Sequence, residues 1–297
     1  MTARTLLWCI IAGTVLTDLL LLDSQGMTVS LQWRAVAGTL FLLALSAAYH
    51  RRSPIISTTA LSATQLVIFS YAGAVLTYVT TAVSASRPLS DELLARADAA
   101  LGFDWFAWFA FVNGHPWLKI PLAIAYGSIP PQLMLLFGYM AFKEPRRANE
   151  FLLATMLSAI LLAPIMAALP AAAHTINAVE PWRDDTLALR AHTLRQIGAL
   201  EGIVTFPSFH TTLAILFINT VRGRRWFRPV LMGNALMIVS VFSEGAHYLV
   251  DVLGGLALAV VAIAAARFLL SRCHEGSSPV KGLLDDALPG SLGQPVG

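Results

Sequence analysis

The distribution of apolar residues constrains this chain more than any other feature. A helix that crosses the apolar core of a bilayer needs about 20 mostly apolar residues. Eight segments are close to or above that length, and they are 5–23, 31–49, 55–83, 117–142, 150–173, 204–221, 227–245 and 247–271. Of the 297 residues, 57% are hydrophobic and only 12% are charged, whereas charged residues make up about 25% of soluble proteins. The sequence therefore predicts an all-α, polytopic membrane helix bundle with about eight transmembrane helices.

Two stretches need separate interpretation. The first apolar segment is followed by no clear small-residue cleavage site, so we expect a retained helix and not a signal peptide. The stretch 90–114 combines Asp91, Glu92 and Arg96 with an aromatic run over 103–111. That mixture is typical of an amphipathic helix lying in the membrane interface, where Trp and Phe anchor well.

Basic residues predict the orientation. One alternate set of loops, together with the tail, holds 13 of the 20 Lys and Arg residues, and the other set holds most of the acidic residues. The positive-inside rule places the first set in the cytoplasm, with both termini, in a bacterial inner (plasma) membrane. The formal net charge of +3 is small and comes from these loops. It does not indicate a nucleic-acid partner.

The first polar motif interrupts the apolar pattern at 205–210, on the predicted outer face. Pro207 suits the first turn of a helix and Thr205 could cap it. A helix N-terminus has free N–H groups that favour anions. Ser208 and His210 would add a hydroxyl and an imidazole in the same turn, so the motif predicts a phosphate site.

The second motif contains His247 and Asp251, four residues apart and therefore on one helix face. A carboxylate in that position can hold the imidazole in one tautomer, which suits a histidine that attacks phosphorus. His210 would then be the general acid that protonates the leaving oxygen. Gly245 and the pair 254–255 would allow backbones to approach closely.

The two motifs together resemble those of the type 2 phosphatidic acid phosphatase superfamily. The residues are Pro-Ser-Phe-His at 207–210 and His-Tyr-Leu-Val-Asp at 247–251, and 245–255 looks like the inositol phosphorylceramide synthase (inositolphosphotransferase) branch. The resemblance implies a six-helix phosphatase-type core at 90–272. Residues 1–89 would be additional transmembrane helices, and 273–297 a disordered cytoplasmic tail.

The resemblance also implies roles for individual residues. His247 would be the nucleophile that forms a phosphohistidine, Asp251 its orienting carboxylate and His210 the acid, without a metal or another cofactor. Ser208 would bind the phosphoryl oxygens. The arginine that clamps phosphate in the family's phosphatases is replaced here by Val241. We expect Arg183 to take its place, with Arg190 and Arg195 as the other external candidates.

The expected function is that of a lipid phosphatase or phosphotransferase at the outer membrane face. Its substrate would be a lipid phosphate, an isoprenyl phosphate or a phospholipid, and the sequence sets neither the lipid nor the oligomeric state. Three alternatives stay open at this point. The chain could be a non-catalytic transporter or scaffold with an incidental His cluster, the His and Asp groups could bind zinc, and Ser208 could act only as a helix cap.

Overall fold

The computed structural model describes residues 1–174, 181–198 and 202–273, apart from the side chains of 181–183. The predicted tail 273–297 lies almost entirely outside the described residues.

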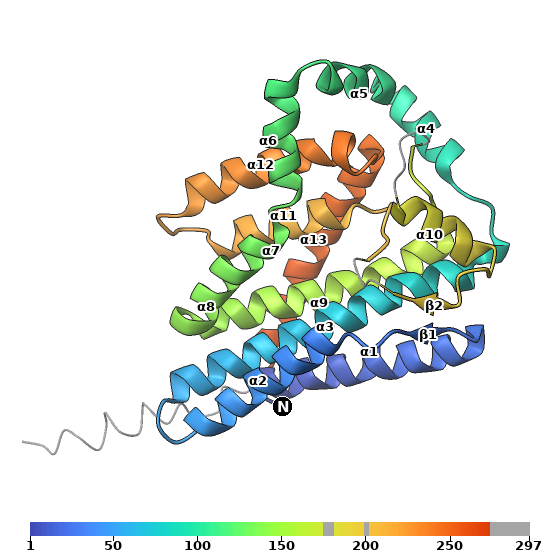
Figure 1. Cartoon of the computed structure of the whole chain (residues 1–297). Helices are drawn as coiled ribbons and strands as arrows, with labels where there is room; N and C mark the ends of the chain where they lie inside the picture. Colours follow the sequence, from blue (N-terminus) through green and yellow to red (C-terminus); the bar gives the residue numbers. More distant parts are fainter. Residues whose placement is uncertain (175–180, 199–201, 274–297) are drawn as a thin grey trace, which may run out of the picture.

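The long helices of the protein run side by side as a bundle (Figure 1). They are α1 (Ala3–Gln25), α2 (Trp33–Tyr49), α3 (Pro54–Val83), α9 (Pro145–Ala168), α11 (Phe209–Thr220), α12 (Phe227–Glu244) and α13 (Leu249–Ser271). The shorter elements are β1 (Thr28–Val29), η1 (Ser84–Ser86), α4 (Asp91–Ala100), α5 (Trp105–Asn113), α6 (Pro116–Tyr126), α7 (Ile129–Gln132), η2 (Leu133–Phe137), α8 (Gly138–Lys143), α10 (Pro181–Arg190) and β2 (Gln196–Ile197).

Within the described residues, the regular structure is all-helical apart from one short strand pair, and several of the helices fit a membrane. In the described part of the chain, four helices are long and apolar enough to cross a bilayer: α1, α3 extended to Ser86, α9 and α13. The bent pair formed by α6 and the segment 129–143 would make a fifth. The helices α2 and α11 are apolar but shorter. An integral membrane protein is therefore supported, but the predicted count of eight transmembrane helices is not confirmed.

Two predicted helices are divided in the structure. The segment 117–142 is bent by 48° between Tyr126 and Ile129 and then contains a π-helical turn at 133–137. Prolines at 121, 130 and 131 explain the irregularity, because proline removes a backbone donor and bends helices. The stretch 90–114 forms α4 and α5 and not one helix. Gly102 adopts a left-handed φ of 76° between them, and the Asp104 side chain caps α5 by accepting from the Ala107 N–H at 3.0 Å.

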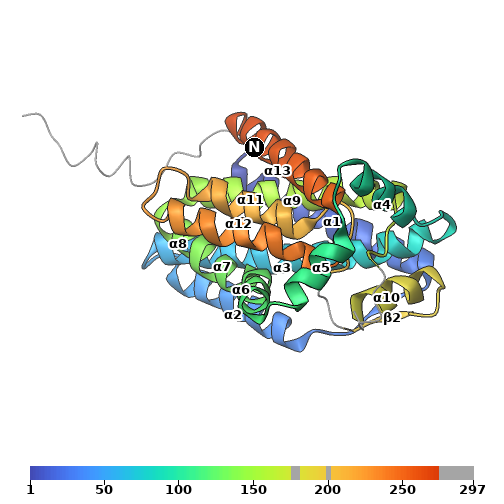
Figure 2. The same ribbon diagram turned by 90° about the horizontal axis from the view of Figure 1, so that it is seen from above.

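The helix α9 lies at the centre of the bundle. It contacts α3 on one side and α11 and α13 on another, and Figures 1 and 2 show the same neighbours from two directions. Eleven of its 24 residues are buried, and several of these belong to the largest hydrophobic cluster, which also takes residues from α1, α3, α8, α11 and α13. The burial of this apolar surface supplies the main packing energy. The packing holds the predicted core against the three N-terminal helices.

The N-terminal helices are also tied to the segment that leads into the first motif. β1 pairs in parallel with β2, with Thr28 opposite Gln196 and Val29 opposite Ile197. The Ile203 N–H donates to the hydroxyl of Thr77 on α3 at 3.1 Å. The chain therefore enters the first motif from a surface that α1 and α3 define.

Candidate active site

The second motif forms a buried His–Asp pair where α13 begins. His247 Nδ1 lies 2.9 Å from Asp251 Oδ2, and the two side chains are 3% and 0% exposed. The same carboxylate oxygen accepts from the backbone N–H of Tyr248 at 2.9 Å. A carboxylate can only accept, so Nδ1 carries the proton and the other ring nitrogen keeps its lone pair. His247 therefore has the tautomer that a nucleophile needs.

Burial also sets the charge of this ring. His247 lies in the loop between α12 and α13, and burial lowers its pKa to about 4. A backbone hydrogen bond with Thr205 acts in the opposite direction, because it stabilises the charged ring. At neutral pH the imidazole is therefore uncharged and able to attack an electrophile.

The first motif differs from the sequence prediction in its capping. Ser208 is the N-cap of α11, and its Oγ accepts from the N–H of Thr211 at 3.4 Å and from the Thr211 hydroxyl at 3.2 Å. Thr205 is not the cap. Pro207 was predicted to lie in the first turn, but it precedes the N-cap. The reason is local, because the short hydroxyl of Ser208 reaches the free N–H of the third helical residue.

Ser208 also joins the two motifs. Its backbone N–H donates to the Asp251 carbonyl at 3.0 Å, and its side chain is fully buried. Ser208 therefore caps α11 and links the two motifs. Its Oγ already accepts two hydrogen bonds, but the hydroxyl proton has no assigned acceptor within the described structure, so phosphate binding by Ser208 stays a prediction.

The two glycines at 254–255 explain how closely the motifs pack. A Cβ atom added to Gly255 would lie 2.4 Å from the Ser208 carbonyl oxygen, and one added to Gly254 would lie 3.0 Å from Pro207 Cβ. Thr212 strengthens the contact by donating its hydroxyl to the Gly255 carbonyl at 3.1 Å. The sequence prediction of a close backbone approach at 254–255 is confirmed.

His210 lies in the first turn of α11 and belongs to the same site. Its ring stacks on Tyr126 with the centroids 4.2 Å apart and an interplanar angle of 11°. The Tyr126 hydroxyl and His247 Cδ2 lie 3.0 and 2.8 Å from the point that a Cβ on Gly245 would occupy. His210 and His247 are close enough to interact electrostatically. The structure thus brings together His210, His247 and Asp251, and it adds Tyr126 between the two histidines.

Two acidic residues of α4, which the sequence analysis did not assign to the site, hold the start of α13. Asp98 is 2% exposed and accepts from the backbone N–H groups of Leu249 at 2.7 Å and Val250 at 3.0 Å. Burial raises the pKa of Asp98, and these two hydrogen bonds oppose the rise. The free N–H groups of α13 are therefore occupied by a carboxylate of the protein itself.

Asp91, the first residue of α4, has a similar role. It accepts from the Tyr248 hydroxyl at 3.1 Å and from the N–H of Ala172 at 3.0 and 3.1 Å. Burial and the charge of Asp91 raise the pKa of Tyr248. Asp91 and Asp98 are seven residues apart, which is two helical turns and one face. That spacing is the sequence signal that could have identified them.

A third histidine packs against the loop that carries His247. The His174 ring lies 4.2 Å from Trp105 and 4.0 Å from Tyr248, and its backbone N–H donates to the Ala246 carbonyl at 3.2 Å. Burial lowers the pKa of His174 to about 4. Ala173 and Ala246 both adopt left-handed φ values, 64° and 49°, beside Trp105. Strained backbone of this kind is held in place by surrounding contacts, and here it adjoins His247.

Two of the three predicted phosphate-binding arginines contact backbone carbonyls, and the side chain of the third lies outside the described residues. Arg195 Nη1 donates to the Gln25 carbonyl at the end of α1, at 2.6 Å. Arg190 donates to carbonyls of Ser84, Ala85 and Arg87 after α3. Both neutralise the negative end of a helix dipole. The Arg183 side chain lies outside the described residues, and Val241, where the family's phosphatases have arginine, is fully buried.

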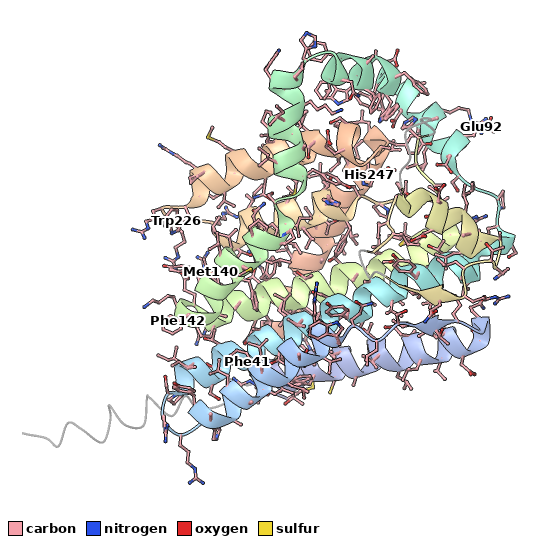
Figure 3. The ribbon with its side chains drawn as sticks, in the orientation of Figure 1. Phe41, Glu92, Met140, Phe142, Trp226 and His247 are labelled. Atoms are coloured by element: carbon pink, nitrogen blue, oxygen red, sulfur yellow. The ribbon has the colours of Figure 1, made fainter. Side chains whose placement is uncertain are left out.

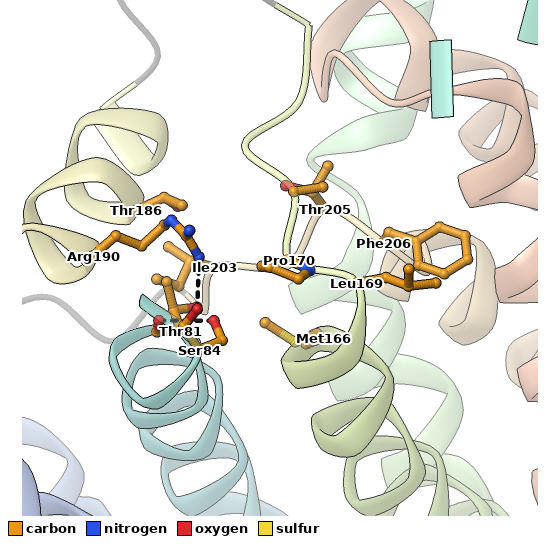
Figure 4. A pocket seen from close by; sticks show the side chains of 11 residues that line it. Thr81, Ser84, Met166, Leu169, Pro170, Thr186, Arg190, Ile203, Thr205 and Phe206 are labelled. Atoms are coloured by element: carbon orange, nitrogen blue, oxygen red, sulfur yellow. Dashed lines mark hydrogen bonds between the residues drawn. The ribbon is translucent and has the colours of Figure 1, made fainter. Parts of the chain in front are cut away.

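Arg190 also lines a small pocket that reaches the first motif. The pocket lies between the end of α3, the end of α9 and the segment 203–206, and it includes Thr205 and Phe206 (Figure 4). Thr205 is the residue whose backbone is hydrogen-bonded to His247. Among the described residues, no group of three or more His, Cys, Asp or Glu side chains is arranged to hold a metal ion.

These features define a polytopic helical membrane protein with a buried His–Asp pair and a second histidine beside it. The family model described as PAP2 superfamily matches residues 92–265. This match covers more than half of the chain, which therefore belongs to the PAP2 superfamily. A search of curated proteins and a search of solved structures found no match. Membership supports an enzyme of the phosphatase and phosphotransferase type that acts on a lipid phosphate.

Proposed function

We propose that the protein cleaves a lipid phosphoester, or transfers its phosphoryl or phospho-headgroup, through a phosphohistidine on His247. The observation that carries the proposal is the buried His247–Asp251 pair beside His210. The pair places the proton of the His247 ring on Nδ1, burial keeps the ring neutral, and a backbone hydrogen bond with Thr205 is a further contact of the ring. The family match over both histidine motifs supports this reaction class.

In the first step, the free ring nitrogen of His247 attacks phosphorus, and an N–P bond forms while the P–O ester bond breaks. His210 gives its proton to the departing oxygen. Phosphate binding makes protonated His210 more stable, because a nearby negative charge favours the charged form of an imidazole. Asp251 stabilises the positive charge that develops on His247.

In the second step, water or an alcohol attacks the phosphohistidine. His210 accepts the proton of the attacking oxygen, the N–P bond breaks and His247 is restored. Water makes the protein a phosphatase, whereas a lipid or polyol hydroxyl makes it a phosphotransferase of the inositolphosphotransferase type. Neither a metal nor another cofactor takes part in the proposed steps.

The phosphate charge has to be balanced near these groups. Ser208 and the first N–H groups of α11 would bind the phosphoryl oxygens, and Arg183 is the proposed cation. Arg190 is a second candidate, because it lines the pocket that contains Thr205 (Figure 4). Its hydrogen bonds to described residues use three of the five N–H donors of the guanidinium, which leaves two for a ligand in the described part of the chain.

The basic loops support an orientation with both termini in the cytoplasm and the site on the outer face of a bacterial inner membrane. The proposed substrate is a membrane lipid: a lipid phosphate, an isoprenyl phosphate or a phospholipid. The proposed domain limits remain 1–89 for the additional helices, 90–272 for the catalytic core and 273–297 for the tail. The core limits are close to the family match at 92–265.

The test uses purified protein in lipid nanodiscs and a panel of ³²P-labelled lipid phosphates, isoprenyl phosphates and phosphoinositol lipids. Wild type should release phosphate or form a new phospholipid, and acid-labile label should remain on the protein after rapid quenching. His247→Ala should lose both signals. His50→Ala is a matched control, because His50 lies in the exposed connection between α2 and α3. Full activity in His247→Ala would refute the mechanism, whereas a wild-type protein with no activity on any substrate of the panel would favour a non-catalytic transporter or scaffold.

A further inference from the structure

A cavity with several charged lining residues lies far from the histidines. Its charged lining consists of Arg147 at the start of α9, Glu150 one turn later, Arg222 after α11 and Arg267 near the end of α13, and its volume is about 350 Å³. Helices rise about 1.5 Å per residue, so this cleft is roughly 24 Å from Asp251 along α13. It is a separate feature from the proposed catalytic site.

Two of the three arginines are held in place by the protein. Arg147 Nη1 donates to the carbonyls of Thr220 at 2.9 Å and Arg222 at 2.8 Å. Arg267 donates to Glu150 and to the Asn219 side chain, each at 2.8 Å. Because these guanidinium groups are already ordered, a ligand would not need to immobilise them. The carbonyls at the end of α11 would repel an anion, but Arg147 already occupies them.

The charges of the cleft are not balanced. Three arginines face a single carboxylate, Glu150, which Arg267 already contacts at 2.8 Å. Arg147 shares Glu144, outside the cleft lining, with Arg224. Arg222 is exposed, and its side chain forms no hydrogen bond or ion pair with the described part of the chain. The cleft therefore has a net positive charge and one free guanidinium whose planar fork matches phosphate oxygens.

Aromatic residues on both sides place the cleft at the level of a membrane interface. Trp226 is 45% exposed with the Arg225 guanidinium 4.7 Å from its ring centroid, and Phe268, next to Arg267, is 56% exposed with Arg272 at 4.6 Å. Tryptophan is enriched at membrane–water interfaces. Figure 3 shows Trp226 at the edge of the bundle, away from the interior position of His247.

We propose that this cleft binds the phosphate group of an anionic phospholipid, at the end of the bundle opposite to the catalytic histidines. Arg222 supplies the free guanidinium, and Arg147 and Arg267 provide a fixed positive wall. The aromatic residues on both sides favour a lipid headgroup over a free phosphate ion, although the two share the same recognition chemistry. The proposal does not rest on the proposed catalytic function.

The experiment measures lipid binding by native mass spectrometry of delipidated protein in a non-ionic detergent. The His247→Ala background prevents turnover, and dioleoylphosphatidylglycerol is compared with zwitterionic dioleoylphosphatidylcholine. We expect one preferred phosphatidylglycerol site. Arg222→Gln should weaken it about tenfold, the effect of losing one charge-assisted hydrogen bond. Arg222 has no partner to lose, so this variant should fold, and an unchanged melting temperature would confirm it.

Arg52→Gln is the matched control, because it removes the same charge from an exposed loop outside the cleft. Its phosphatidylglycerol affinity should equal that of the background protein. Equal weakening by Arg52→Gln and Arg222→Gln, or equal binding of both lipids, would overturn the proposal by showing only diffuse attraction. Millimolar inorganic phosphate could displace the lipid from the wild-type cleft and have no such effect in Arg222→Gln. That result would support the anion site but assign it to free phosphate.

Discussion

Replacing Asp251 by Asn would separate the charge of the His–Asp pair from its shape. One carboxylate oxygen accepts from His247 Nδ1 and from the Tyr248 N–H, each at 2.9 Å. The other oxygen is buried without a partner among the described residues. If the Asn oxygen takes the first position, both hydrogen bonds survive and the new NH₂ group is buried unpaired. That costs about 1–3 kcal/mol of folding stability. If the amide is reversed, its NH₂ group faces His247 Nδ1 and the Tyr248 N–H. Both of these are donors, so the proton of His247 would have to move to the other ring nitrogen.

The expected catalytic loss is much larger than the stability loss. Without the carboxylate, the positive charge that forms on His247 during attack is no longer stabilised. In hydrolases with a comparable His–Asp pair, the Asn variant loses about 10⁴-fold in rate, which corresponds to about 5.5 kcal/mol of barrier. We therefore expect Asp251→Asn to fold, with a melting temperature a few degrees lower, and to lose three to four orders of magnitude in the rate of phosphohistidine formation.

Rapid-quench trapping of ³²P-labelled protein measures that rate directly, and thermal unfolding in the same nanodiscs measures the stability. A rate within threefold of wild type would refute the assigned role of Asp251. If the variant does not fold, Asp251→Glu provides the second measurement. Glutamate keeps the charge but misplaces it, so a folded protein with normal activity would contradict the geometric argument.

Three further outcomes follow from the structure. Asp98→Asn should lower the free energy of unfolding by about 2–4 kcal/mol, because one of two buried N–H groups loses a charged acceptor. Chemical denaturation should show it. Gly255→Ala should destabilise the protein by about 1–3 kcal/mol or more through overpacking. Gly233→Ala is the control, because a Cβ there meets nothing within 4 Å, and it should be neutral or slightly stabilising. Equal melting temperatures for the two variants would contradict the packing argument. Finally, stability should fall as the pH drops from 6.5 towards 4, because the unfolded chain then binds protons that buried His174 and His247, with pKa values lowered to about 4, do not. A denaturation profile that is flat across this range would show that neither ring is buried and neutral.

The parts of the site that could be predicted from the sequence are those set by local geometry. The i, i+4 spacing predicts a His247–Asp251 pair, and the structure brings the two side chains within hydrogen-bonding distance. The predicted shared helix face is not found, because α13 begins at Leu249 and His247 lies in the loop before it. Apolar segment length likewise predicts a membrane bundle. The predicted count of eight spans is not confirmed, because prolines bend the segment 117–142 and residues 204–208 lie outside α11.

The parts that could not be predicted depend on long-range contacts. Asp98 and Leu249 are 151 residues apart in sequence, and periodicity gives no information about which helix end a carboxylate will reach. Charge alone made Arg195 a candidate phosphate ligand, but the structure shows its guanidinium on the Gln25 carbonyl at the end of α1. Helix ends compete for cations with any ligand, and only the tertiary arrangement decides which one obtains them.

The contact between Asp98 and the start of α13 has a consequence for biosynthesis. Ribosomes make α4 long before α13, so the Asp98 carboxylate has neither of its two N–H partners until the final helix has been inserted. His247 and the groups that fix it therefore come together only in the completed bundle. A nascent or truncated chain that ends before His247 lacks both residues of the His–Asp pair, so the proposed mechanism predicts that it has no activity on lipid phosphoesters before assembly is finished.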